Sequence, residues 1–493
     1  MNEHKGKVLG AFVWRLLQNI ATQAAAFAIS IILARILLPE DYGLVAIINV
    51  FITVALVFIN TGFSSAVIQK KEINPRDLDT IFYTSLICGA ILYAILYLIA
   101  PAISVFYDEP RLTALFRVEC LIVPVASIYS VQQSLITRNL WFNKGFAISL
   151  IAMIFQGAIG ISLAYLGYGV WALVISTLAN SVVSAILAWI FVGWRPGASF
   201  SVNSFRSMFA FSMNILASGV LTEAYNNIKA VVIGKQYSSA DLAYYNRGNQ
   251  FPTLIMAQVD GALTTVMFPS LSKYQDDWNQ GLSVMRKTLK LSMYICVPLM
   301  FGLIAVAEPM VRLLLTDKWL PCVKYMQLTA LICMTWPLSM REVAIKGLKR
   351  SDIALKLNVF NMVLSLIGML FTYKISVMAM LVSSIVVVCI CQIVEAIVYK
   401  KYLQYKILDL ICDIFPTFFM SFIMYVICLC LKKHIILIDS LMLMLEILIG
   451  AAVYIVLSLI TKNENFFYLT GVITEFYFKI FRKTNGGVSN KHY

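Results

Sequence analysis

Long apolar runs follow one another along almost the whole chain, and they restrict the possible fold more than any other feature. A membrane-spanning helix needs about 20 mainly apolar residues, because in lipid the backbone must satisfy its polar groups internally. Of the 493 residues, 60% are hydrophobic and 13% are charged. Soluble domains carry about 25% charged residues, so we expect an all-α membrane protein.

The apolar runs predict about fourteen transmembrane helices joined by short loops. The helices are expected near residues 13–35, 43–65, 81–104, 112–135, 146–167, 169–192, 206–233, 244–269, 286–307, 323–345, 353–373, 376–399, 411–431 and 435–461. The first run is preceded by neither the short apolar core nor the small-residue cleavage site of a signal peptide. We therefore expect the first helix to stay in the protein.

Lysine and arginine residues are distributed unequally between alternate loops. If the N-terminus is cytoplasmic, the even-numbered loops and both tails hold 23 of the 39 basic residues, and the opposite loops hold 9. Cytoplasmic loops carry the excess of lysine and arginine in membrane proteins. The bias predicts that both termini are cytoplasmic, and it favours an even number of helices.

Polar residues recur at an interval of 200 positions, which indicates an internal repeat. The matched pairs are Thr22 with Thr222, Asn49 with Asn249, Thr53 with Thr253, Asn60 with Asp260, and Ser64 with Thr264. Six helices separate the copies, so both should have the same orientation in the membrane. The predicted parts are an N-lobe (1–200), a C-lobe (201–405), helices 13 and 14 (406–462) and a cytoplasmic interfacial or disordered tail (463–493).

Polar side chains recur at helical spacing in the first two helices of each copy. Such stripes mark helix faces turned toward protein or water, since lipid-facing surfaces are apolar. They comprise Arg15, Gln18, Asn19 and Thr22; Asn49, Thr53, Asn60 and Ser64; Asn214, Ser218, Thr222, Tyr225 and Lys229, with Glu223 and Asn226 beside them; and Asn246, Gln250 or Asn249, Thr253, Asp260 and Thr264. We predict a polar cavity between the halves, although hydrogen bonds between packed helices would also satisfy single residues.

Other charges lie inside the predicted helices. Glu223 and Lys229 are six residues apart, and a structural ion pair is an alternative to contact with substrate. Arg117 with Glu119, and Arg341 with Glu342, are expected near helix ends, where their charged groups can reach the interface.

Several other classes of function are disfavoured. The net charge of +14 comes from residues in short loops, and no basic arm or helix indicates nucleic-acid binding. Neither a nucleophile elbow nor a phosphate-binding loop motif occurs, so no enzyme activity is expected. Most of the ten cysteines lie in apolar runs and the three histidines are isolated, so we expect no metal and no cofactor.

Several short motifs are similar to those of a known family. They are Ala34-Arg35-Ile36-Leu37-Leu38-Pro39-Glu40-Asp41-Tyr42-Gly43, Gly62-Phe63, Ile68-Gln69-Lys70-Lys71-Glu72, Ile233-Gly234-Lys235, Tyr245-Asn246-Arg247 and Lys318-Trp319-Leu320-Pro321. Over residues 10–400 the chain resembles the bacterial polysaccharide transporter family. These are the Wzx-type flippases of the MATE-like MOP superfamily, and the branch for exopolysaccharide, colanic acid or teichuronic acid export is the most similar. At Ser238-Ser239-Ala240 the second copy lacks the Pro-Glu of the first, so a differently shaped junction is expected.

The resemblance implies a MATE-like fold of two six-helix lobes with two further helices. It implies that an undecaprenyl-diphosphate-linked oligosaccharide moves from the inner to the outer leaflet of the bacterial cytoplasmic membrane, for exopolysaccharide, capsule or O-antigen synthesis. It also implies alternating access coupled to an ion gradient. The sequence leaves open which glycan is carried, which ion is used and whether a glycan polymerase is a partner.

Candidate roles follow from this substrate. Cations suit a diphosphate, and hydroxyls and amides suit sugars. The expected phosphate ligands are Arg15, Lys229 and Arg247. The expected sugar-binding or cavity-lining residues are Gln18, Thr22, Asn49, Thr53, Asn60, Asn214, Ser218, Thr222, Tyr225, Asn249 and Thr253. Glu223 and Asp260 are expected to serve ion coupling or charge balance.

Two alternatives stay open. A MATE-type exporter of small organic cations would need an acidic cavity, whereas Arg15, Lys229 and Arg247 make the polar helices mixed to basic. A non-transporting membrane component of glycan assembly, or a membrane-embedded polymerase, is the other class.

Overall fold

The computed structural model describes residues 2–63, 67, 68, 70, 72–273, 278–435, 438–471 and 474. Within these ranges the side chains of 2–13, 15–17, 20, 61–63, 207, 208, 210, 211, 214, 260, 262–273 and 278 are not described. The predicted residues Arg15, Asn214 and Asp260 therefore lie outside the described side chains.

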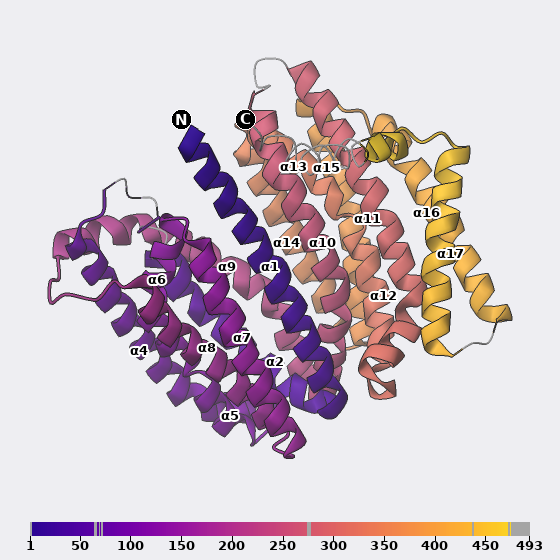
Figure 1. Ribbon diagram of the computed structural model, residues 1–493. Helices are drawn as coiled ribbons and strands as arrows, with labels where there is room; N and C mark the ends of the chain where they lie inside the picture. The colour runs from indigo at the N-terminus through magenta and orange to yellow at the C-terminus, as the bar shows by residue number, and fades with distance from the viewer. Residues whose placement is uncertain are drawn as a thin grey trace, which may run out of the picture. The chain divides into compact units, whose positions relative to one another are not determined.

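The described part of the chain is helical and contains no strand (Figure 1). The first helices are α1 (Asn2–Ile36), α2 (Pro39–Val57), the π-helix η1 (Phe58–Phe63), α4 (Pro75–Tyr107), α5 (Leu112–Glu119), α6 (Ile122–Arg138), α7 (Phe142–Tyr165), α8 (Val170–Val192) and α9 (Val202–Gln236). The others are α10 (Ser239–Lys273), α11 (Trp278–Leu315), η2 (Asp317–Trp319), α12 (Cys322–Cys333), η3 (Trp336–Ser339), α13 (Met340–Gly347), α14 (Ser351–Thr372), α15 (Val377–Leu403), α16 (Ile407–His434) and α17 (Asp439–Ile460).

Every predicted apolar run overlaps one helix or one interrupted helix, which confirms the all-α membrane fold. Among the described residues, 11 helical stretches are long and apolar enough to cross a membrane, and a shorter apolar helix covers Ala21–Ile36. α1, α9 and α10 are not among the 11 stretches. The number of fourteen spans therefore stays a prediction.

The chain is divided into two compact units, Met1–Asn246 and Arg247–Tyr493. In the first unit, α7 packs between α1 and α8, and α9 packs against α2, η1 and α4. Phe82 of α4 fills the core there, with its ring edge-on to Trp189 and Trp194. The lobe boundaries predicted from the repeat stay a prediction.

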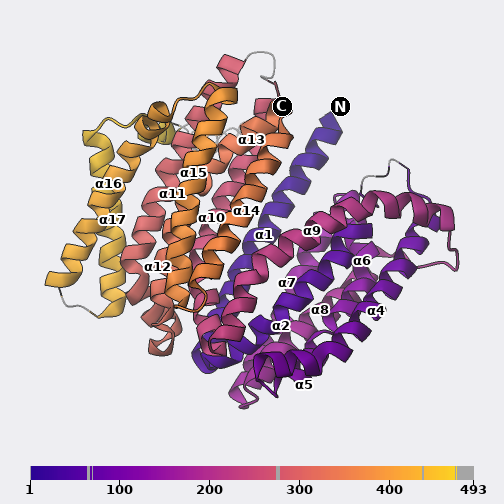
Figure 2. The same ribbon diagram turned by 180° about the vertical axis from the view of Figure 1, so that it is seen from behind.

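In the second unit, α11 is the helix around which others pack. It contacts α12, α16 and α17, and α16 and α17 lie side by side (Figure 1). Its buried residues Leu289, Met293 and Val297 lie one turn apart and meet apolar side chains of α16. α14 and α15 form a second pair in this unit (Figure 2).

The fourth predicted helix of each copy is broken, and proline explains both breaks. A proline inside a helix clashes with the carbonyl group four residues earlier and lacks the N–H that would bond to it. Four residues before Pro124 is Cys120, where α5 ends, and four residues before Pro337 is Cys333, the last residue of α12. The sequence predicted a continuous helix in both places.

The two helix junctions of the repeat share one capping hydrogen bond, although Ser238-Ser239-Ala240 predicts a differently shaped second junction. The backbone N–H of Leu38 donates to Asp41 Oδ2 at 3.2 Å, and that of Ser238 donates to Asp241 Oδ2 at 3.3 Å. In each case the carboxylate satisfies a backbone donor at the start of a helix. The aspartate, present in both copies, makes the Pro-Glu pair unnecessary for this turn.

Ion pairs join loops that the charge count assigns to the same side. In the first unit Lys235 Nζ lies 2.9 Å from Asp108 Oδ2, and both belong to loops predicted to be outside. In the second unit Lys432 Nζ lies 2.6 Å from Glu308 Oε2, again between predicted outer loops. Each pair agrees with the predicted alternation at the two loops that it joins, and the sidedness of the whole chain stays a prediction.

Candidate functional site

The polar stripe of α9 is accessible over much of its length. Ser218 and Thr222 are exposed, while Tyr225 and Lys229 are partly buried. The Ser218 hydroxyl donates to the Ile215 carbonyl at 2.9 Å, and the Thr222 hydroxyl donates to the Ser218 carbonyl at 2.8 Å. Both hydroxyl protons are used within the helix, so their oxygens are left to accept hydrogen bonds from a ligand.

One residue that the sequence analysis missed links two predicted site residues. Asn227 of α9 donates through Nδ2 to Thr53 Oγ1 of α2 at 3.4 Å, to the Glu223 carbonyl oxygen at 2.9 Å and to Glu223 Oε2 at 3.4 Å. The polar faces of α2 and α9 therefore meet inside the first unit. The signal for Asn227 was its position one turn after Glu223 on the same helix face.

The second half of the predicted stripe on α2 continues into η1. The Thr53 hydroxyl donates to the Asn49 carbonyl at 2.9 Å, and Asn49 itself is exposed. Asn60 is also exposed and lies in the π-helix Phe58–Phe63. Single π-helical turns are rare and occur frequently at functional sites, because the wider turn redirects side chains and frees backbone groups.

On α1, Gln18 of the polar stripe is engaged in packing, whereas Asn19 is exposed. Gln18 is buried and donates through Nε2 to Ser149 Oγ of α7 at 3.0 Å. The Thr22 hydroxyl donates to the Gln18 carbonyl at 2.6 Å. The bond from Gln18 to Ser149 joins two packed helices, which is the alternative that the sequence left open, whereas the bond of Thr22 lies within α1. A sugar-binding role for Gln18 and Thr22 stays a prediction.

Arg247, near the start of α10, is closely surrounded by other side chains of the second unit. Arg247 is buried, its Nη1 donates to Gln250 Oε1 at 2.8 Å, and its guanidinium lies 5.1 Å from the ring centre of Trp319. Gly248 allows this approach, since a Cβ there would lie 2.7 Å from the Cys322 carbonyl oxygen. Asn249 and Thr253 are partly buried.

Two charges expected at helix ends are buried instead. Glu119 is fully buried, and its Oε1 accepts from the Thr177 hydroxyl of α8 at 3.4 Å. Arg341 is 1% exposed, pairs with Glu395 at 3.3 Å and also donates to Gln392. The helix breaks explain the difference, because they place both residues beside a break within the bundle rather than at a membrane surface.

A polar pocket of the second unit is lined by Glu395, the ion-pair partner of Arg341. It has a volume of about 240 Å³, and Glu342, Asn358, Asn361 and Glu395 are among its lining residues. No role for Glu395 follows from the sequence alone, and in the structure it lines this pocket. Glu446 of α17 is also buried, and none of the described side chains offers its carboxylate a hydrogen bond.

The chain is similar to known proteins of glycan assembly. A family model described as a polysaccharide biosynthesis protein matches residues 32–324, more than half of the chain. The succinoglycan biosynthesis transport protein ExoT of Rhizobium meliloti is 24% identical over 306 residues. That alignment covers 62% of this chain and 62% of ExoT, so it spans less than two thirds of that relative.

Solved structures share the fold. A structure of the lipid II flippase MurJ in an inward closed conformation has a TM-score of 0.72 at 16% identity, and the match covers 90% of this chain and 98% of MurJ. An inward-facing MATE family multidrug transporter of the MOP superfamily has a TM-score of 0.57 at 17% identity, covering 80% of this chain and 98% of the transporter. The chain therefore shares the fold of these membrane transporters.

Proposed function

Since the chain belongs to the family of polysaccharide biosynthesis proteins, we propose that it is a flippase for a lipid-linked oligosaccharide. The carried lipid is undecaprenyl diphosphate, and movement is from the inner to the outer leaflet of the bacterial cytoplasmic membrane. The observation that carries the proposal is the meeting of polar side chains from α2 and α9 through Thr53, Asn227 and Glu223. Polar groups at such depth are costly, and in transporters they mark substrate pathways.

The two chemical parts of the substrate meet different conditions during translocation. Its hydrocarbon tail can stay in the lipid, while the diphosphate and the sugars must cross the membrane core. We assign the diphosphate to Lys229 and Arg247, with Arg15, because ammonium and guanidinium groups form strong charge-assisted hydrogen bonds with phosphate. Arg247 can serve only if its guanidinium leaves the Trp319 ring, a change that alternating access would supply.

The sugars are assigned to the hydroxyl and amide groups of the polar stripes. Among these, Asn49, Asn60, Ser218 and Thr222 are exposed, and a ligand can reach them without displacing other side chains. Glu223 is assigned to ion coupling or charge balance, because Asn227 ties its carboxylate to the polar face of α2. Asp260 has the same proposed role.

A strain that lacks the chromosomal copy tests the proposal. The wild-type gene should restore surface polysaccharide, and without it the lipid-linked oligosaccharide should accumulate in the inner leaflet. A normally expressed Lys229→Ala/Arg247→Ala protein should restore little export. Export at the parental rate by this double variant would show that the phosphate assignment is wrong.

The alternative of small-molecule export can be separated in the same strain. A drug exporter would change resistance to organic cations and leave surface polysaccharide unaltered. Our proposal predicts the opposite pattern, since lysine and arginine in the polar helices repel cations.

A further inference from the structure

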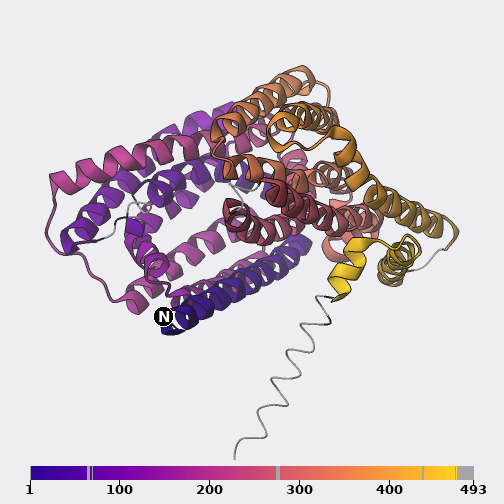
Figure 3. The same cartoon turned by 90° about the horizontal axis from the view of Figure 1, so that it is seen from above.

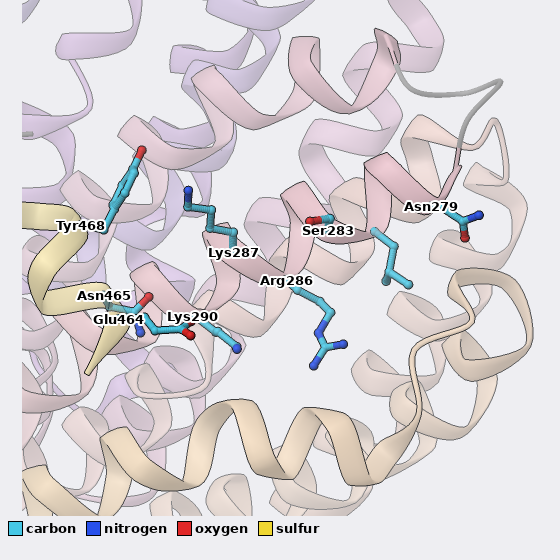
Figure 4. A pocket seen from close by; sticks show the side chains of 9 residues that line it. Asn279, Ser283, Arg286, Lys287, Lys290, Glu464, Asn465 and Tyr468 are labelled. Carbon is cyan, nitrogen blue, oxygen red and sulfur yellow. The ribbon is translucent and has the colours of Figure 1, made fainter. Parts of the chain in front are cut away.

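A basic pocket lies at one end of the second unit, and none of its lining residues belongs to the polar stripe of α10. It has a volume of about 620 Å³ and is bordered by the first turns of α11 and by the helical residues 464–471 that follow α17 (Figure 4). Figure 3 shows the latter segment in yellow, after the end of α17. Arg286, Lys287 and Lys290 line the pocket from α11. Such a volume suits a small ligand or a lipid headgroup, since ligand pockets measure about 300–1,000 Å³.

Two of the three cations are held in place by a buried carboxylate behind the pocket. Asp413 of α16 accepts from Arg286 Nε at 2.8 Å and from Arg286 Nη2 at 3.0 Å, and Lys290 Nζ lies 3.0 Å from its Oδ1. The bonds to Asp413 use two of the five N–H groups of the guanidinium. The pair is therefore fixed in position and keeps donors for a further acceptor.

Tyr405 fixes the carboxylate in turn. Its hydroxyl donates to Asp413 Oδ2 at 2.7 Å. Burial, together with the bond to Asp413, raises the pKa of Tyr405, so the phenol keeps its proton and remains a donor. Arg286 and Lys290 are therefore held by a carboxylate that is itself hydrogen-bonded, unlike side chains that move freely at a surface.

Lys287 differs from its neighbours. It is exposed, and its Nζ lies 4.2 Å from the ring centre of Tyr468. Among the described side chains no carboxylate lies within ion-pair distance of it, and Figure 4 shows Lys287 extending from α11 on the side of Tyr468. Its charge is the one most available to an incoming anion.

The position of the pocket indicates a ligand from the headgroup level of the membrane. α11 is a candidate span over Asn279–Leu315, so the pocket lies at the end of a membrane helix. Tyr468, on its other wall, and the neighbouring Phe467 are large exposed aromatic residues, and aromatic side chains of this kind gather at the level of lipid headgroups. Among the lining residues three cations, Arg286, Lys287 and Lys290, outnumber one carboxylate, that of Glu464. Asp413 and Asp409 of α16 offset part of this charge from outside the lining.

We propose that this pocket binds the phosphate of an anionic phospholipid headgroup, with Lys287 as the main electrostatic contact and Arg286 and Lys290 as hydrogen-bond donors. Basic pockets between membrane helices on the cytoplasmic side recognise such headgroups. The bound phosphate would join α11 to residues 464–471 and stabilise the docking of the segment after α17. The site is independent of the translocation proposed above.

Lipid binding to the full chain tests this proposal. The purified protein, depleted of lipid in neutral detergent, is titrated with phosphatidylglycerol or with phosphatidylcholine, while native mass spectrometry counts bound lipid and Tm is measured in parallel. Lys287→Gln should weaken phosphatidylglycerol binding about fivefold and reduce the lipid-dependent rise in Tm. Lys287→Arg should retain both effects.

Lys374→Gln is the matched control, because Lys374 is an exposed lysine beside a tyrosine, 5.7 Å from the ring centre of Tyr373, at the other predicted face. It should bind phosphatidylglycerol like the wild type. Equal binding by Lys287→Gln and the wild type, with both folded at the same Tm without lipid, would overturn the proposal. Equal binding of phosphatidylcholine would also overturn it.

A further arm separates the lipid from a free anion. Inorganic phosphate at millimolar concentration should not displace phosphatidylglycerol, since the lipid is also held by its chains. Displacement by inorganic phosphate, lost in Lys287→Gln, would show a site for a soluble phosphate and would contradict the lipid assignment.

Discussion

Lys229 is the partly buried cation of the polar stripe on α9, and its removal tests the phosphate assignment one charge at a time. A hydrogen bond to a charged group contributes about 1.5–3 kcal/mol, so Lys229→Ala should lower transport by roughly 10- to 100-fold. Lys356→Ala is the control, because Lys356 is an exposed lysine within a helix of the other unit. The measurement is the rate of glycan export at equal expression, and equal rates in the two variants would contradict the assignment.

Arg341 provides a prediction about stability. Its guanidinium is 1% exposed and pairs with Glu395, so Arg341→Ala should leave a partly buried carboxylate without its partner. The expected loss is about 3–5 kcal/mol. Thermal unfolding in detergent should show a marked fall in Tm for Arg341→Ala and a smaller one for Arg341→Met/Glu395→Gln. A double variant no more stable than the single one would show that the ion pair is not the reason.

For single residues, the sequence predicted which side chains lie on polar helix faces better than it predicted which charged side chains are buried. Thr53 and Glu223 were expected on polar faces, and the structure joins them, but through Asn227, which was missed. Glu119 and Arg341 were expected at membrane surfaces and are buried. Burial depends on which neighbouring helices cover a residue, and helical spacing within one segment does not contain that information.

At the scale of elements, Gly43 tests how closely α2 and the start of α10 approach within the first unit. A Cβ on Gly43 would lie 1.8 Å from the Ser239 carbonyl oxygen, a backbone atom that cannot rotate away. Gly43→Ala should therefore force the two segments apart and destabilise the protein by about 1–3 kcal/mol.

Gly302→Ala in α11 is the matched substitution, because no atom lies within 4 Å of the added Cβ. Alanine favours helix by about 1 kcal/mol over glycine, so this variant should be at least as stable as the wild type. The measurement is Tm in detergent for both variants. Similar Tm values would mean that α2 and Ser239 are not in close contact.

Helix content was largely predictable at this scale, whereas helix continuity was not. The apolar runs found the helices because their length reflects the thickness of the bilayer. The breaks after Cys120 and Cys333 depend on Pro124 and Pro337, and a proline can also remain in an intact helix, as Pro298 and Pro309 do in α11. Whether a proline bends or ends a helix is decided by packing around it.

For the whole molecule, the predicted sidedness can be measured directly. A reporter that is active only in the cytoplasm should be active when it is fused at Gly197 or Lys349. A reporter that is active only outside should be active when it is fused at Gly167 or Lys374, because the cytoplasmic loops carry the excess of basic residues. The alternation predicts this result for fourteen spans. The same sidedness at Gly167 and Gly197 would refute it.

The central claim concerns the movement of a lipid-linked sugar, and leaflet transfer in proteoliposomes measures it most directly. The purified full chain is reconstituted with a fluorescent polyprenyl-diphosphate sugar, and a membrane-impermeant quencher reports the fraction of sugar in the outer leaflet over time. We predict transfer well above that of protein-free vesicles, and a much slower rate for Lys229→Ala. Transfer no faster than in protein-free vesicles, by folded and correctly inserted protein with an ion gradient imposed, would contradict it.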